Sequence, residues 1–353
     1  MPGHAWLNLA CQYSTRRGYF CCHVVIWRQI MGMSELMLPE FDALSDERRQ
    51  QIMELIAQHT GVRLLRIERF ERWGRSCTTG VFEAHGREMV LVPGAEVTLG
   101  WDHFEQGLDE DTTEELNCVM DEYEIDCSIP ELLAQGMTAV RSFTAPPLLV
   151  ARRYEPLGWE EVDVNDKRIL PKWRSSLRQL EKDHDRRSIE IHKTVRFEKK
   201  GDQIRAFLAH EVTLKELKEL LSRQGFTMAT ADEWAWLCGG GCRTLFACGD
   251  YFTSDMCIKH FKEDGDDRPY TLEEPNFFGL SIGYDPYQYE LVDAEERTVC
   301  GGDGGCNICG GLGPYMGYLP ASPHARPQVK GGQQLNINFD FCRPVIRLDD
   351  LKL

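Results

Sequence analysis

The chain has 353 residues, of which 56 are acidic and 40 are basic, so its formal net charge at neutral pH is −16. A protein gains affinity for nucleic-acid backbones and anionic membranes chiefly by bringing Lys and Arg side chains to them. This acidity therefore argues against nucleic acids and membrane surfaces as partners.

The N-terminal residues 1–33 differ in composition from the rest of the chain. They lack the succession of basic, apolar and small residues that marks a signal peptide. We interpret them as a disordered extension without a function, and Met31 or Met33 would serve equally well as a start. No apolar run reaches the ~20 residues that a spanning helix requires, so we expect no transmembrane helix.

The first regular elements are predicted beyond this extension. A helix is expected over residues 45–59, because Ser45 can cap its N-terminus and apolar side chains recur at helical spacing. Alternating apolar and charged residues then predict a strand over residues 62–70 and a hairpin over residues 80–92. Residues 34–86 are therefore expected to form a small α/β segment.

The middle of the chain contains two charged insertions. Residues 109–124 are strongly acidic with a narrow apolar stripe, which predicts a helix packed on the body through that stripe. Residues 163–187 are polar and highly charged, which is typical of a surface insertion. A strand is predicted over residues 189–197, and an amphipathic helix over residues 213–221 begins at a cap on Thr213.

The most informative segment is TMATADEWAWLCGGG at residues 227–241, which is followed by Cys-Gly-Asp at residues 248–250. Thr230 can cap a helix here, and the carboxylates of Asp232 and Glu233 suit the positive end of the helix dipole. We interpret this segment as scaffold rather than as a catalytic element.

Five segments together resemble the motifs of the formylglycine-generating enzyme (sulfatase-modifying factor) family. They are residues 227–241, REMVLVPGAEVTLG at 87–100, VRSFTAPPLLVARRYEP at 140–156, PNFFGL at 275–280 and NFDFCRPVIR at 338–347. The resemblance implies an α+β, C-type-lectin-like fold of the formylglycine-generating enzyme type, irregular with short strands and long loops. We therefore expect one such domain over residues 87–353, preceded by the small α/β segment over residues 34–86.

The 14 cysteines of the chain are too few for a disulfide scaffold, which predicts a reducing compartment, the cytoplasm. They nevertheless gather in two clusters, and such close spacing more often indicates metal or redox chemistry than core filling. The first cluster comprises Cys238, Cys242, Cys248 and Cys257, and the second comprises Cys300, Cys306 and Cys309.

The second cluster lies in CGGDGGCNICGG at residues 300–311. Enzymes of the resembled family place two cysteines after a Gly-Gly turn, and these thiolates hold a copper(I) ion that activates oxygen against a substrate cysteine. Cys306 falls at the expected distance from the turn, but two residues separate it from Cys309 where the family has four. Both sulfurs can still bind one soft ion, so Cys306 and Cys309 are the predicted catalytic and metal-binding residues.

Two other interpretations of these cysteines stay open. One is a set of small, inert thiols buried beside glycines. The other is a closed structural zinc site in which four sulfurs exclude any substrate. That site would combine Cys306 and Cys309 with two of Cys238, Cys242, Cys248 and Cys300.

Asn276 is a predicted calcium ligand, because the resemblance implies a structural calcium ion held through the Asn of the PNxFG motif. A second calcium motif of the family has decayed in residues 284–290, so at most one calcium site is expected. The alternative for Asn276 is a turn residue that hydrogen-bonds its own backbone.

The ten histidines show no HxxxHxE spacing, the motif of related iron enzymes that form sulfur–carbon bonds. His210, His260 and His324 stand alone and are predicted to be ordinary surface or core polar residues.

The sequence thus predicts a copper-dependent oxidase resembling formylglycine-generating enzyme, which uses oxygen and acts on a cysteine-containing peptide or protein. The alternative belongs to another class: a non-catalytic, lectin-like binding module with a structural thiolate metal site, because a fold does not settle a function.

Overall fold

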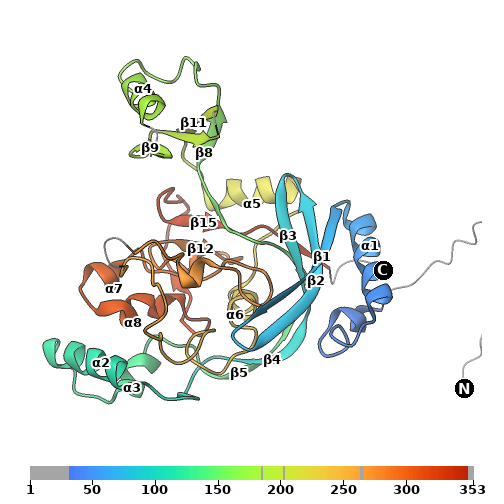
Figure 1. Cartoon of the computed structure of the whole chain (residues 1–353), viewed down its shortest axis with the longest axis vertical. Helices are drawn as coiled ribbons and strands as arrows, with labels where there is room; N and C mark the ends of the chain where they lie inside the picture. Colours follow the sequence, from blue (N-terminus) through green and yellow to red (C-terminus); the bar gives the residue numbers. More distant parts are fainter. Residues whose placement is uncertain (1–31, 184–185, 202, 263–265, 349–353) are drawn as a thin grey trace, which may run out of the picture. The chain divides into compact units, whose positions relative to one another are not determined.

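The computed structural model describes residues 32–183, 186–201, 203–262 and 266–348 (Figure 1). The extension predicted over residues 1–33 lies almost entirely outside them. The described residues combine helices with several sheets that are mainly antiparallel, which confirms the predicted α+β class. None of the helices in these ranges is long and apolar enough to cross a membrane.

One five-stranded antiparallel sheet unites the two ends of the described chain. Its strands are, in spatial order, β1 (Arg63–Arg72), β2 (Arg75–Ala84), β3 (Arg87–Val92), β6 (Leu148–Ala151) and β16 (Val345–Arg347). Helix α1 (Asp46–Thr60) packs on β1 and β2 (Figure 1), and Ser45 Oγ caps it by accepting from the Arg48 N–H at 3.2 Å. The boundary predicted between residues 86 and 87 falls in the turn that joins β2 to β3, two paired strands of this sheet. The described residues before this boundary also share one hydrophobic core with residues after it.

A second five-stranded sheet lies in the C-terminal part of the chain. Its order is β14 (Gln328–Val329), β13 (Thr298–Cys300), β12 (Tyr289–Leu291), β15 (Asp340–Cys342) and β7 (Glu155–Pro156). The β12–β15 pair is parallel, whereas the other pairs are antiparallel. The two-stranded sheet of β4 (Ala95–Leu99) and β5 (Arg141–Ala145) is separate.

The segment over residues 227–241 contains helix α6 (Ala231–Gly239), as predicted. The Glu233 N–H donates to Thr230 Oγ1 at 3.3 Å, and the Thr230 N–H donates to Glu233 Oε2 at 2.7 Å, which is a capping box. Gly240 ends the helix at a φ of 57°, a left-handed conformation that favours glycine. Most of α6 is buried, in agreement with its interpretation as scaffold.

Residues 159–209 form a small module with a core of its own, which includes Leu180, Val195 and Phe197. It contains helix α4 (Arg174–Lys182) and a sheet in the order β8 (Trp159–Val162), β11 (Gln203–Ala209), β10 (Val195–Lys200) and β9 (Ser188–Ile191). The single strand predicted over residues 189–197 is in fact two strands. Lys193, at a φ of 49°, makes the turn between them, and the apolar pattern does not reveal such a turn.

The acidic stretch forms helix α2 (Glu110–Glu122), which Asp109 Oδ1 caps by accepting from the Thr112 N–H at 3.0 Å. Leu116, Val119 and Met120 of its apolar stripe are buried, as predicted, whereas Tyr123 at the end of the stripe is exposed. Helix α2 packs against α8 (Gly313–Tyr318). The remaining elements are α3 (Ile129–Ala134), α5 (Leu214–Arg223), α7 (Cys306–Cys309), η1 (Met33–Leu36), η2 (Thr271–Glu273) and η3 (Leu319–Ala321).

A buried ion pair joins the two five-stranded sheets. Arg343 donates from Nε to Glu290 Oε2 at 2.7 Å and from Nη2 to Glu290 Oε1 at 2.9 Å. Its remaining donors reach the Ala151 carbonyl and the Ser281 carbonyl, both at 2.7 Å. Ala151 ends β6, so the guanidinium ties β12 to the end of β6 in the first sheet.

Replacing Glu290 by Gln keeps the shape of the side chain but removes the counter-charge of the buried guanidinium. We expect the free energy of unfolding, measured by urea denaturation, to fall by about 3–5 kcal/mol. The exposed pair between Arg63 and Glu83, at 3.3 Å, provides the control, because such pairs contribute little. Arg63→Gln should leave the free energy of unfolding almost unchanged. An equally small loss of stability in both variants would contradict the role of Glu290.

Candidate functional site

The predicted cysteine pair lies on the surface, on one short helix. Cys306 and Cys309 are the first and last residues of α7, and both are exposed. Residues three apart on a helix share one face, so Cys306 and Cys309 lie on the same face of α7. Six of the other described cysteines are buried, namely Cys77, Cys238, Cys242, Cys257, Cys300 and Cys342.

Two glycines let the loop before α7 lie against residues 286–288. A Cβ atom on Gly302 would stand 2.5 Å from the carbonyl oxygens of Pro286 and Gln288. Gly305 has a φ of 76°, and a Cβ there would lie 2.3 Å from the Tyr287 ring. Larger residues would force the loop away, which accounts for the glycine-rich sequence at this place.

Asp303 holds the start of α7. Its Oδ1 accepts from the Cys306 N–H at 2.9 Å and its Oδ2 from the Asn307 N–H at 3.1 Å. Its backbone carbonyl accepts from the Cys306 thiol at 3.2 Å and from the Tyr289 hydroxyl at 3.1 Å. Asp303 was not among the predicted site residues, because a capping residue is expected immediately before a helix and Gly305 occupies that position here.

Asp303→Ala removes both side-chain acceptors from the start of α7. We expect the free energy of unfolding to fall by about 1 kcal/mol, the usual cost of a lost helix cap. Asp303→Asn keeps one acceptor oxygen, so its free energy of unfolding should fall by less than that of Asp303→Ala. Urea denaturation of the two variants checks the order, and equal losses would contradict it, because they would show that the oxygen retained in Asp303→Asn contributes no stability.

The far end of α7 is held by a tyrosine. The Tyr287 hydroxyl lies 3.1 Å from Cys309 Sγ, and the Tyr287 ring packs on the His260 ring with 4.5 Å between centroids. His260 Nε2 is 2.9 Å from Asp285 Oδ1, and Lys259 Nζ donates to Asp285 Oδ2 at 2.7 Å. The histidine that stands alone in the sequence is therefore part of a cluster beside the cysteine pair.

Asp285 is the buried centre of this cluster. Burial alone would raise the pKa of its carboxyl, but the hydrogen bonds from Lys259 and His260 outweigh burial and lower the pKa below its ordinary value. The carboxylate is therefore charged at neutral pH and balances the ammonium group of Lys259. No local sequence pattern links Tyr287 to Cys309, because the contact spans 22 residues.

On the Cys306 side, Lys330 lies over the Tyr289 ring, with its Nζ 4.3 Å from the ring centroid. Its Nζ donates to Gln328 Oε1 at 2.6 Å, and Gln328 Nε2 donates to the Gly302 carbonyl at 3.3 Å. Burial lowers the pKa of Lys330, against a smaller raising effect from Cys306 and Asp303. These contacts join β14 to the glycine-rich loop.

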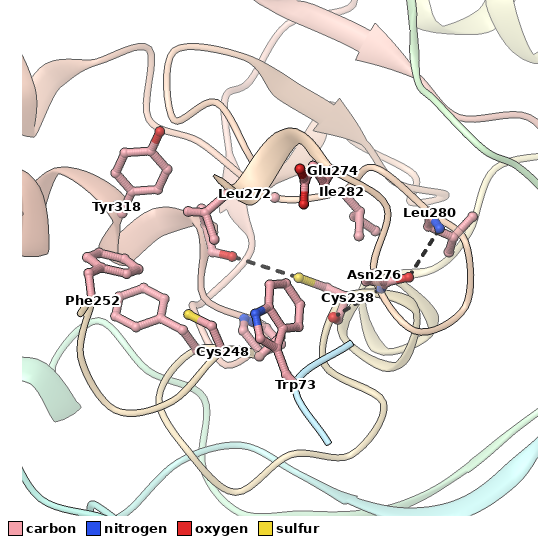
Figure 2. Close-up of a pocket in the computed structure, with 15 residues that line it drawn as sticks. Trp73, Cys238, Cys248, Phe252, Leu272, Glu274, Asn276, Leu280, Ile282 and Tyr318 are labelled. Atoms are coloured by element: carbon pink, nitrogen blue, oxygen red, sulfur yellow. Dashed lines mark hydrogen bonds between the residues drawn. The ribbon is translucent and has the colours of Figure 1, made fainter. Parts of the chain in front are cut away.

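The cysteines of the first cluster lie elsewhere. Cys238 and Cys248 line a cavity of about 20 Å³ together with Asn276, and neither Cys306 nor Cys309 lines it (Figure 2). Burial raises the pKa of Cys248 to about 12, and a protonated thiol is a poor metal ligand. Within the described ranges, no group of three or more His, Cys, Asp or Glu side chains is arranged to hold a metal. The closed zinc site therefore has no support in the described part of the chain.

Asn276 uses its side chain to hold the turn in which it lies. Its Oδ1 accepts from the Leu280 N–H at 3.1 Å, as Figure 2 shows. The same oxygen accepts from the Phe278 N–H at 3.0 Å. Its Nδ2 donates to the Leu237 carbonyl at 2.9 Å. These hydrogen bonds agree with the alternative interpretation of Asn276, a turn residue that hydrogen-bonds its own backbone. The buried amide has no oxygen free for an ion. The calcium prediction for Asn276 does not fit this donor set.

His324 is a buried core residue, one of the two outcomes predicted for it. Its Nε2 lies 3.0 Å from the Thr244 carbonyl and 3.8 Å from Cys242 Sγ, whereas its buried Nδ1 has no hydrogen-bond partner. Burial lowers the pKa of His324 from 6.5 to about 4. The imidazole is therefore neutral in the folded protein at neutral pH.

This lowered pKa predicts a pH-dependent stability. Between pH values of about 6.5 and 4 the unfolded chain binds a proton at His324 that the folded chain does not, so stability falls by about 3 kcal/mol as the pH drops through that window. His324→Gln should lack this part of the loss, whereas His59→Gln, at an exposed position of α1, should retain it. Urea denaturation at pH 7 and at pH 4.5 measures the difference, and parallel losses in all three proteins would refute it.

No protein-family model and no curated protein matches this chain. The likeness to formylglycine-generating enzymes therefore rests on the residues of the five segments.

Proposed function

We propose that the chain is a copper-dependent oxidase of the formylglycine-generating enzyme type, with a C-type-lectin-like fold, that uses oxygen to oxidise a cysteine-containing peptide or protein. The observation that carries the proposal is the pairing of Cys306 and Cys309 on one exposed helical turn. A substrate can reach thiols at this place, which a closed structural site would not allow.

The two sulfur donors, Cys306 and Cys309, suit copper(I) better than they suit zinc or calcium. Cys306 and Cys309 offer two soft sulfur donors, and the described residues add no third His, Cys, Asp or Glu ligand to them. Soft thiolates select copper(I), whereas structural zinc takes four ligands. Cys306 and Cys309 would hold the ion, which supplies the activation of oxygen when it is bound.

The residues of the chain itself prepare the site. Asp303 fixes the backbone of Cys306 through two hydrogen bonds, and Tyr287 contacts the sulfur of Cys309. Because α7 is exposed, a peptide can approach both thiols without an opening motion. These features support a reaction at the surface on an extended substrate.

Anaerobic titration with copper(I) against a competing chelator tests the metal site. We expect the wild-type protein to bind one ion, and Cys306→Ser and Cys309→Ser to lose more affinity than the ~100-fold that loss of an outer contact costs. Cys118→Ser, an exposed thiol on α2, should bind as the wild type does. If the two serine variants bind copper(I) as tightly as the wild type, the proposal is wrong.

Oxygen uptake separates the oxidase from the alternative, a non-catalytic binding module. The copper-loaded wild-type protein should consume oxygen in the presence of a reductant and a cysteine-containing peptide, and Cys306→Ser should not. A wild-type protein that binds copper(I) and the peptide but consumes no oxygen would favour the binding module.

A further inference from the structure

We propose that Tyr287 is the positioning residue of the cysteine pair: its hydroxyl sets the direction of the Cys309 sulfur, and His260 and Asp285 hold Tyr287 in place. The inference rests on the proposed function in that it treats Cys306 and Cys309 as a metal site. It concerns orientation, so Tyr287 neither binds the ion nor reacts.

Tyr287 contacts both ends of α7. At one end its hydroxyl is 3.1 Å from Cys309 Sγ, which is short for a hydrogen bond that involves sulfur. At the other end its ring lies against Gly305, where a Cβ atom would come within 2.3 Å of it. The ring therefore lies along the helical turn that carries both thiols.

Two further contacts restrain Tyr287. Its backbone N–H donates to Asp285 Oδ1 at 3.1 Å, and its ring packs on His260. His260 adopts a φ of 70°, a left-handed conformation that costs free energy in a non-glycine residue. Its hydrogen bond to the buried Asp285 and its contact with Tyr287 offset that cost. The strain at His260 therefore belongs to an arrangement that fixes the tyrosine.

The two sulfurs have different hydrogen-bonding partners. The Cys306 thiol donates to the Asp303 carbonyl at 3.2 Å, whereas among the described residues the Tyr287 hydroxyl is the hydrogen-bonding partner of Cys309 Sγ. An exposed cysteine without such a partner samples several staggered rotamers. Two-sulfur binding gains affinity when both sulfurs already face the ion, and outer contacts of this kind contribute about 10–100-fold in metal affinity.

The pair Tyr287→Phe and Tyr123→Phe tests this role. Tyr287→Phe removes the hydroxyl but keeps the ring on His260. Tyr123→Phe removes a hydroxyl that donates to the Gly310 carbonyl at 3.2 Å, a backbone group next to α7 and not a thiol. In the anaerobic titration we expect Tyr287→Phe to weaken copper(I) binding by about 10–100-fold and Tyr123→Phe to leave it unchanged.

A second readout needs no metal. In the metal-free protein with ¹³Cβ-labelled cysteine, NMR couplings of the Cys309 β-protons report whether one rotamer dominates. The wild type and Tyr123→Phe should show one rotamer at Cys309, and Tyr287→Phe should show averaging there with Cys306 unchanged. His260→Asn, which tolerates the left-handed backbone but lacks the ring, should also show averaging at Cys309.

The two readouts separate this inference from the proposed function. If the wild-type protein binds no copper(I), the oxidase proposal fails, while the NMR couplings still decide the role of Tyr287. If Tyr287→Phe leaves both the couplings of Cys309 and the copper(I) affinity as they are in Tyr123→Phe, Tyr287 does not position the sulfur.

Discussion

The ion pair between Glu290 and Arg343 is the contact on which the rest of the described body depends. Burying two charges costs more than their attraction returns unless every remaining donor finds a partner, and here the guanidinium reaches two carbonyls besides the carboxylate. The pair fixes β12 against the end of β6. Residues 285–289 lead directly into Glu290, so the base of the cysteine site is anchored in the core.

From that base the site is built outward by short-range contacts. The Pro286 carbonyl accepts the Asp303 N–H at 2.9 Å, which places the glycine-rich loop over residues 286–288. Asp303 then holds the start of α7, and Tyr287 contacts its end. A helix of four residues would not persist in isolation. Its position comes from these tertiary contacts, and this explains how an exposed turn can present two sulfurs in a defined arrangement.

Local sequence patterns predicted the elements whose signals are local. The caps at Ser45 and Thr230 located α1 and α6, because each cap accepts a hydrogen bond from a backbone N–H only three residues away. The parallel pairing of β12 with β15 had no such signal, because about fifty residues separate the partners and neither three-residue strand has a periodic pattern. The contact of Tyr287 with Cys309 could not be predicted from a local pattern either, because 22 residues separate the two. The cysteines themselves were found because their spacing is short.

The spacing of Cys306 and Cys309 departs from that of the resembled family, yet the helical turn gives the departure a physical meaning. Two residues between cysteines place both side chains on one face of a helix, so a pair that would diverge in an extended loop converges on α7. Burial then separates these thiols from the others in the chain. It raises the pKa of Cys242 to about 11 and that of Cys248 to about 12, which keeps those sulfurs protonated, whereas Cys306 and Cys309 are exposed. Exposure therefore distinguishes Cys306 and Cys309 from Cys242, which is buried, and from Cys248, which is half-buried.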